Sequence, residues 1–182
     1  MKTLNEQLIQ YAEYHRDKRN ILTHFIGIPL IAVAVATLLS RPEWHLLGLS
    51  LTPALLVASA ASVFYLKLDL RFGLTMAVAL AISLWIGQAL AAQSTALWLS
   101  AGLGLFVVGW IIQFVGHIYE RRKPAFLEGV VGLAIGPLFV AAEVAFLLGL
   151  RKEVQEAVEA VAGPAVITIA AAAPLGGAFV AL

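Results

Sequence analysis

Three histidines lie near the ends of apolar segments, where a membrane helix would meet water: His15, His24 and His117. Imidazole is the commonest protein ligand of catalytic transition metals. A single histidine at a membrane interface more often makes an ordinary hydrogen bond than binds a metal. Three of them at one face of a helical bundle could together hold one ion. The pattern therefore indicates a metal site with these three histidines as catalytic ligands.

Other common catalytic chemistries have no basis in this sequence. The chain contains no cysteine, which excludes disulfides, iron–sulfur clusters and thiolate-bound haem. It also lacks the Gly-x-Ser-x-Gly turn of hydrolases, the Walker loop and a glycine-rich dinucleotide loop. The histidine spacing differs from the tight histidine boxes of di-iron membrane desaturases. Any metal must therefore be held by histidine, carboxylate, amide or water.

The composition is that of a membrane protein. Of 182 residues, 61% are hydrophobic and 13% are charged, whereas soluble domains average about 45–50% apolar and about 25% charged residues. The charges stand in short clusters between long apolar runs, which is typical of a polytopic α-helical protein. The formal net charge of +1 gives no indication of a nucleic-acid partner. Membrane lipid is the expected surrounding.

The apolar runs predict an all-α bundle with four spans. Each run approaches the ~20 residues that cross about 30 Å of hydrocarbon. They cover residues 25–40, 46–66, 72–92 and 96–116. Residues 1–19 before them are polar and predict an amphipathic helix with one face formed by Leu4, Leu8, Tyr11 and His15.

A fifth apolar run, residues 126–149, differs from the others. It contains Gly136-Pro137, which would break or kink a helix, so we expect a broken or re-entrant segment rather than a full span. Residues 151–162 then predict a polar helix. Residues 1–162 would form a single membrane-embedded catalytic domain. The apolar segment 163–182 could be a weak span, an interfacial segment or a tail.

Basic residues predict the orientation of the bundle, because they concentrate in cytoplasmic loops. Nine of them flank the spans on one side: Lys2, Arg16, Lys18, Arg19, Lys67, Arg71, Arg121, Arg122 and Lys123. We therefore expect an integral protein of a bacterial inner membrane whose three-histidine site faces the cytoplasm. The fourth histidine, His45, would lie on the opposite face beside Trp44 and have no special role.

The spacing of the ligands requires a bend in the chain. His15 and His24 are nine residues apart, so on one straight helix they would point to opposite faces. We expect the helix to break near Asn20, a plausible N-cap. Asn20 and His24 would then share a helical face.

Several polar residues could complete the site. Gln113, His117 and Glu120 form one stripe at positions i, i+4 and i+7, and Glu120 would be a fourth metal ligand or would orient an imidazole. The same stripe would also suit helix–helix contact, and Glu120 a surface ion pair. Glu143 lies within an apolar run, where carboxylates are usually functional; it reaches the site only if the run breaks at Gly136-Pro137. The residues expected to surround the metal or bind substrate are Tyr14, Asn20, Gln113 and Glu143.

Two segments of the chain have distinctive patterns: Tyr14-His15 with the Asn20–Pro29 entry into the first span, and Gln113–Ala125 at the end of the fourth. Together they resemble a known family, the membrane 2-hydroxy fatty acid dioxygenases of phytosphingosine breakdown by α-oxidation. Leu138–Glu143 is also similar, and the resemblance covers about residues 8–150.

The resemblance implies an iron(II)-dependent dioxygenase. Its substrates would be O2 and a long-chain 2-hydroxy fatty acid, and its products CO2, water and the acid one carbon shorter. This stoichiometry needs no external reductant. Such an acid can chelate iron through its carboxylate and hydroxyl groups, so a few protein ligands with open coordination positions would suffice.

Two other functions fit parts of the sequence. A small transporter or channel would explain Glu143 and the interrupted fifth run, but no inverted repeat is evident. A non-catalytic membrane protein that binds metal or lipid would explain the histidines. The sequence leaves the oligomeric state open, including a homo-oligomer.

Overall fold

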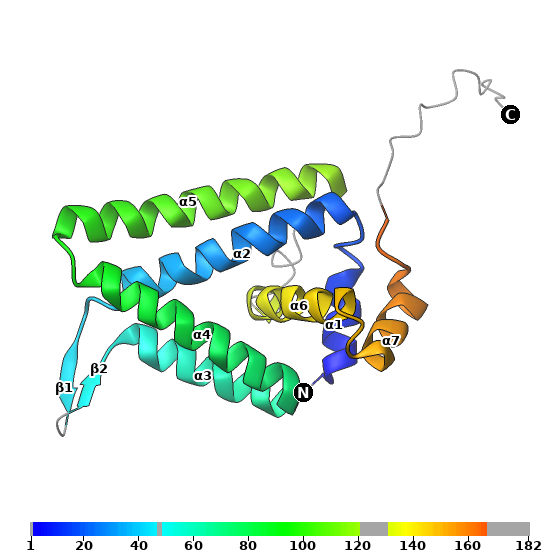
Figure 1. Cartoon of the computed structure of the whole chain (residues 1–182), viewed down its shortest axis with the longest axis horizontal. Coiled ribbons are helices and arrows are strands. Elements are labelled where there is room, and N and C mark those ends of the chain that lie inside the picture. The colour runs from blue at the N-terminus through cyan, green and yellow to red at the C-terminus, as the bar shows by residue number, and fades with distance from the viewer. Residues whose placement is uncertain (1, 47–48, 121–130, 167–182) are drawn as a thin grey trace, which may run out of the picture.

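The computed structural model describes residues 2–46, 49–120 and 131–166. Helices dominate the described residues, and one short hairpin joins two of them (Figure 1). The elements are α1 Leu4–Ala12, α2 Lys18–Leu39, β1 Trp44–Leu46, β2 Leu49–Leu51, α3 Pro53–Leu68, α4 Leu70–Ala91, α5 Thr95–Glu120, α6 Val131–Leu147 and α7 Lys152–Ala162. The expected cluster Arg121, Arg122 and Lys123, and the tail beyond Val166, lie outside the described residues.

Three helices are long and apolar enough to cross a membrane: α2, α4 and α5, with 22, 22 and 26 residues. The prediction of an integral, essentially all-helical membrane protein therefore agrees with the structure. The second apolar run departs from it, because Trp44–Leu46 and Leu49–Leu51 pair as antiparallel strands and α3 begins only at Pro53. With 16 residues, α3 is shorter than the ~20 that a span needs. A fourth span therefore stays a prediction.

Helix α2 lies at the centre and packs most extensively against α5. Glycines allow this close approach: a Cβ on Gly27 would lie 2.9 Å from the carbonyl oxygen of Gly109, and a Cβ on Gly109 would lie 3.0 Å from that of Gly27. Small residues at helix contacts are typical of membrane bundles, where packing rather than the hydrophobic effect drives association. This contact sets how closely α5 can approach His24.

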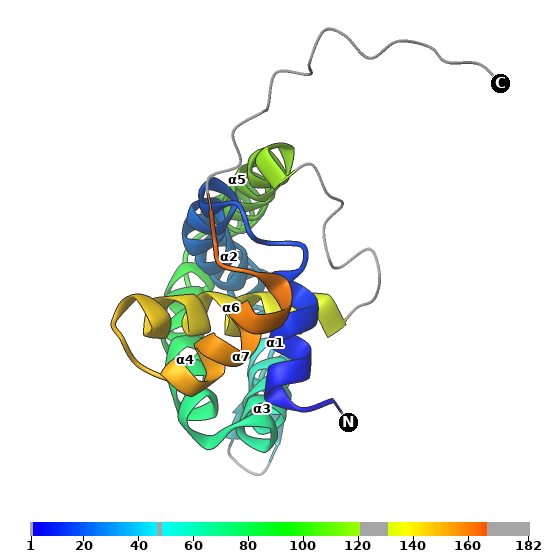
Figure 2. The same cartoon turned by 90° about the vertical axis from the view of Figure 1, so that its right-hand side faces the viewer.

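The short helices gather at the end of the bundle where α2 begins and α5 ends (Figures 1 and 2). Figure 2 looks roughly along the long helices and shows α6 running across this end. The apolar faces of α1, α6 and α7 form one core there, which includes Leu4, Leu8, Tyr11, Ile135, Leu138, Phe139, Val154 and Val158. The amphipathic α1 is thus packed by its apolar face against α6 and α7 at the end of the bundle.

The predicted break at Gly136-Pro137 is wrong. Helix α6 continues through Pro137, and the chain instead bends by 112° between α6 and α7. Ile135, Leu138 and Phe139 around the proline are fully buried, and such packing tolerates a proline that would break an isolated helix. The turn occurs at Gly149 and Arg151, whose φ angles are +71° and +55°.

The start of α7 returns to the end of the bundle where the basic residues gather. The Arg151 guanidinium donates to both carboxylate oxygens of Asp69, at 2.9 and 3.0 Å. Asp69 joins α3 to α4, between Lys67 and Arg71. Arg151 and Lys152 therefore lie at the expected cytoplasmic end, although the hairpin at Pro137 does not exist.

The helix break between His15 and His24 exists, but it lies before Asn20. Helix α1 ends at Ala12 and α2 begins at Lys18, with Asp17 as its N-cap. The Asp17 carboxylate accepts hydrogen bonds from the Arg19 backbone N–H at 2.8 Å and from its guanidinium. Asp17 thus does what was expected of Asn20, which is left inside α2 with its side chain free for the site.

Candidate metal centre

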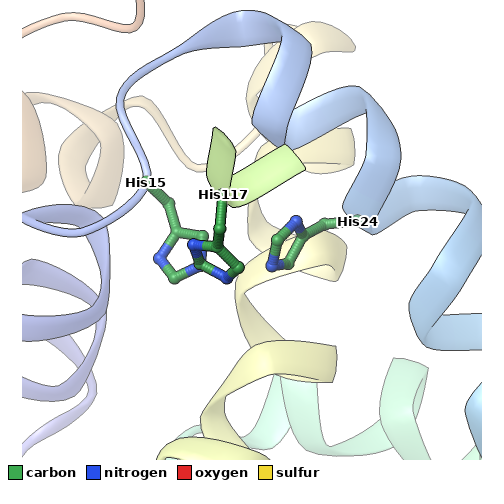
Figure 3. Close-up of side chains that lie close together, drawn as sticks. All are labelled: His15, His24 and His117. Carbon is green, nitrogen blue, oxygen red and sulfur yellow. The ribbon is translucent and has the colours of Figure 1, made fainter. Parts of the chain in front are cut away.

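The three histidine rings meet at the end of the bundle, each from a different element. His15 comes from the turn between α1 and α2, His24 from α2 and His117 from the last turn of α5 (Figure 3). Their ring centroids lie 4.6 Å apart for His15 and His24, 5.0 Å for His15 and His117, and 5.3 Å for His24 and His117. The structure therefore brings together the three histidines that the sequence singles out.

The ring nitrogens fit a metal ion. One nitrogen of each ring lies within 4.8 Å of the others, and imidazole binds first-row metals at about 2.0–2.1 Å. The Nδ1 atoms of His15 and His24 lie 2.9 and 2.8 Å from the backbone oxygens of Tyr11 and Asn20. Because a carbonyl only accepts, both Nδ1 atoms donate, and both Nε2 atoms keep free lone pairs.

Two of the buried nitrogens have no partner in the described structure. They are Nε2 of His15 and Nδ1 of His117. Buried polar atoms without hydrogen bonds are rare in folded proteins and usually indicate an ion, a water or a ligand. The donor set of three neutral imidazoles therefore fits a transition metal with open coordination positions.

The surroundings keep His15 neutral. Its ring is fully buried and stacks on Tyr11, with centroids 4.1 Å apart and an interplanar angle of 5°. Burial lowers the pKa of His15 well below its ordinary value, and the neighbouring His24 and His117 act in the same direction. A neutral imidazole is the form that binds a metal.

Glu120 fixes the turn that carries His15. Its Oε1 accepts the backbone N–H of Arg16 at 2.9 Å, and its Oε2 accepts the backbone N–H of Asp17 at 2.9 Å and the Asn20 amide at 3.0 Å. A carboxylate at these unpaired donors before a helix is favourable. Of the two roles expected for Glu120, the geometry favours positioning over direct ligation.

Glu143 reaches this turn from α6 without the expected break. Its carboxylate forms an ion pair with the Arg16 guanidinium at 3.0 Å, and both side chains are largely buried. The Arg16 guanidinium also donates to the carbonyl oxygens of His15 and Gly163. The expectation that Glu143 depended on a break at Pro137 is wrong, because α6 lies across the bundle end.

The other predicted site residues are Asn20, Gln113 and Tyr14, and they lie in three different surroundings. Asn20 is fully buried and joins His24 to Glu120 through its carbonyl and its amide. Gln113 is buried at the wall of a cavity. Tyr14 is half-buried in the turn, whereas the aromatic ring that stacks on His15 belongs to Tyr11.

Four residues that contact the histidines or fix the turn that carries His15 were not predicted as site residues: Tyr11, Arg16, Asp17 and Phe139. Tyr11 carried a signal, because it lies four residues before His15 on the same expected helical face. The others did not, since the Phe139 ring, 5.7 Å from that of His15, comes from a distant helix. Arg16 is expected from the sequence only as one of the basic residues that set the orientation, and Asp17 lies unremarked among those basic residues.

An apolar cavity of about 560 Å³ begins at the histidines. Its polar end contains Tyr11, His24, Gln113 and His117, and α2 lines it as far as Leu39. His24 and Leu39 are fifteen residues apart, or ~22 Å along the helix. Elsewhere the lining is mostly apolar, and the hydroxyls of Tyr65 and Ser83 donate to backbone carbonyls. The cavity suits a long apolar chain with a polar head at the histidines.

Gly116 is expected to be essential to this geometry. A Cβ there would collide with Thr23 Oγ1 and Asn20 Oδ1, between His24 and His117. Gly116→Ala should therefore push α2 and α5 apart and destabilise the protein by about 1–3 kcal/mol, with loss of bound metal. Thermal unfolding and metal analysis in detergent check this.

Gly104 on the same helix provides the matched control, since nothing lies within 4 Å of a Cβ placed there. Gly104→Ala should be neutral or slightly stabilising, because alanine is the better helix former. Equal effects of the two substitutions would contradict a specific close contact at Gly116.

Comparison with known proteins identifies the family of the chain. Residues 1–148 match the family described as 2-hydroxy-palmitic acid dioxygenase Mpo1-like. The 2-hydroxy-palmitic acid dioxygenase MPO1 of Saccharomyces cerevisiae is 36% identical over 158 residues, which cover 86% of this chain and 87% of the yeast protein. No solved structure matches the chain significantly. The resemblance that the sequence motifs indicated is confirmed, and the chain belongs to the Mpo1-like family.

Proposed function

We propose that this protein is an iron(II)-dependent dioxygenase that shortens long-chain 2-hydroxy fatty acids by one carbon. The observation that carries the proposal is the three-histidine cluster at the polar end of a long apolar cavity. The reaction RCH(OH)COOH + O2 → RCOOH + CO2 + H2O balances without a reductant. Family membership and the name of the yeast relative support this choice of reaction.

His15, His24 and His117 would hold the iron, which when bound would supply O2 activation and a chelation point for the substrate carboxylate and hydroxyl. The chain itself would do the rest. The carbonyls of Tyr11 and Asn20 orient two of the imidazoles. The apolar walls hold the acyl chain and keep bulk water from the reacting carbon.

We further propose that the site faces the cytoplasm. Supporting this, the start of α2, the α3–α4 junction and Arg151 lie at one end of the bundle, and all carry basic residues. The hairpin with His45 lies at the other end (Figure 1). A bacterial inner membrane, as expected from the sequence, would be the location.

Oxygen uptake by the purified protein with iron(II) and 2-hydroxypalmitate tests the function. We expect equal molar O2 consumption and CO2 release, with pentadecanoic acid as product. A protein that binds iron but consumes no O2 with any 2-hydroxy acid would overturn the proposal. Absence of bound metal would support a transporter, and non-exchangeable zinc would support a structural site.

The cavity also predicts a limit on substrate length. Ala54 and Ala58 of α3 are buried at its wall, one turn or ~6 Å apart, and α3 begins at the end remote from the histidines (Figure 1). Phenylalanine at either position should fill the far part of the cavity. We expect a loss of about tenfold or more in kcat/KM for 2-hydroxypalmitate, with shorter 2-hydroxy acids less affected.

The two variants form a graded series. Ala58→Phe lies nearer the histidines and should exclude shorter acids than Ala54→Phe does. Leu56→Phe, on the exposed side of α3, serves as the control for an added ring that faces lipid. An unchanged length profile in both alanine variants would place the acyl chain elsewhere.

A further inference from the structure

Gln113 presents a buried amide without a partner. It lies on α5 one turn before His117, and its side chain is 4% exposed. Neither Oε1 nor Nε2 has a hydrogen-bond partner among the described residues. The side chain lines the cavity and packs against α2 at Gly27, where a Cβ would lie 3.0 Å from Nε2.

Leaving such an amide unpaired is costly, because it gives up its hydrogen bonds to water and gains none in the protein. A hydrophobic residue would be the simpler choice for an apolar cavity wall. The cost is recovered if a ligand in the cavity supplies the partners. Gln113 is therefore a place where the cavity is prepared for a polar group.

The chemistry of the lining narrows what that group is. No lysine or arginine is among the described residues that line the cavity, so the protein side chains available to bind the ligand head are not cationic ones. An amide offers an acceptor at Oε1 and donors at Nε2. This pair matches a hydroxyl group next to a carboxylate oxygen, as in a 2-hydroxy acid, whose hydroxyl donates while its carboxylate accepts.

The position of Gln113 near the histidines also suits binding of a polar head group. Gln113 and His117 are four residues apart and lie on the same face of α5, and both line the cavity with His24. A head group held at the three histidines would lie within one helical turn of the amide. Tyr65 and Ser83 are less suitable, because their hydroxyls already donate to Ala134 and Ala79.

We propose that Gln113 is the specificity-determining residue that recognises the 2-hydroxy acid head through its hydroxyl. This inference rests on the proposed function, whose substrate class it refines. Gln113 would accept a hydrogen bond from the hydroxyl at Oε1 and donate one from Nε2 to the carboxylate. A site built to bond a hydroxyl discriminates against an analogue that lacks it, because its own polar atoms are then left unpaired.

The test compares binding of 2-hydroxypalmitate and palmitate to metal-free protein in detergent by calorimetry. We expect the wild-type protein to bind the hydroxy acid about tenfold more tightly, as one buried hydrogen bond implies. Gln113→Met keeps a similar shape without the polar atoms and should bind the two acids equally. It should also raise the Tm, because an unpaired amide has been removed.

Metal content and kinetics separate recognition from metal binding. Gln113→Met should retain iron and lose kcat/KM mainly through KM. Gln113→Glu, which adds a negative charge facing the carboxylate, should bind the hydroxy acid more weakly than wild type. The control is Gln93→Met, at an exposed position after α4, which should leave binding, iron content and kinetics unchanged.

Two outcomes would overturn the proposal: an unchanged preference for the hydroxy acid in Gln113→Met, or loss of iron in that variant. These differ from a failure of the proposed function. If the wild type prefers the hydroxy acid through Gln113 but never consumes O2, recognition stands and the oxidation is wrong. If the protein consumes O2 but Gln113→Met leaves the preference for the hydroxy acid unchanged, the oxidation stands and recognition by Gln113 is wrong.

Discussion

Alanine in place of His15, His24 or His117 should each reduce oxygen consumption with 2-hydroxypalmitate to background. Each ring contributes one of the three nitrogens that lie within 4.8 Å of one another. Losing a residue that only orients a ligand already lowers metal affinity by about 10–100-fold. Losing a ligand itself should exceed that, so iron content after dialysis should fall with activity in all three variants.

The stability of the three variants should differ, which separates metal loss from unfolding. His15 is fully buried, stacked on Tyr11 and near the Phe139 ring, so His15→Ala leaves a cavity and should lower the Tm of the metal-free protein. His117 is only partly buried, and its replacement should change that Tm least. A uniform loss of stability with normal iron content would contradict a metal site.

His45 provides the matched control on the same chain. It lies exposed in β1, where its ring contacts Ser50 at 3.2 Å, at the end of the bundle remote from the other three (Figure 1). His45→Ala should leave iron content, oxygen uptake and Tm unchanged. Equal losses at all four histidines would indicate a general effect on folding.

Topology alone was enough to single out the three clustered histidines in the sequence. Alternating spans must place the start of the first and the end of the fourth at one membrane face, and His45 at the other. The need for a bend between His15 and His24 followed from helical geometry. The position of the bend did not, because Asp17 and Asn20 are both good N-caps and only tertiary contacts of Asn20 decide between them.

The errors have a common physical cause. Gly136-Pro137 would break or kink an isolated helix, but α6, packed across the bundle end, continues through it. Likewise Leu49–Leu51, at the start of the second apolar run, pairs with Trp44–Leu46 as a strand, although its hydropathy suits a membrane span equally well. The contact of Arg16 with Glu143 and that of Phe139 with His15 depend on where α6 lies, and no local pattern encodes that.

Glu120→Gln should produce the second large effect, through the turn rather than through the metal. The carboxylate accepts three hydrogen bonds, from Arg16 N, Asp17 N and the Asn20 amide. In glutamine one of the two oxygens becomes an NH2 group, which must face at least one of these donors. Two donors then oppose each other at a part-buried position, which costs more than a lost hydrogen bond.

The consequence should appear in metal affinity before it appears in folding. The turn carries His15, whose Nδ1 bond to Tyr11 alone cannot fix where the ring lies. We expect iron affinity to fall by about 10–100-fold, as for other residues that orient a ligand. The free energy of unfolding of the metal-free protein should fall by about 1–3 kcal/mol. Competitive chelation and thermal unfolding measure the two quantities.

Glu143→Gln is the control that tests whether the backbone hydrogen bonds of Glu120 position His15. Glu143 touches the same turn, but through the side chain of Arg16 in an ion pair at 3.0 Å, and that guanidinium keeps its bonds to His15 and Gly163. Glutamine still offers it an oxygen, so iron affinity should fall much less than in Glu120→Gln. If the two variants bind iron equally well, the backbone bonds of Glu120 do not position His15. In that case its carboxylate serves only the start of α2, and the site must be held by the α2–α5 contact at Gly116 instead.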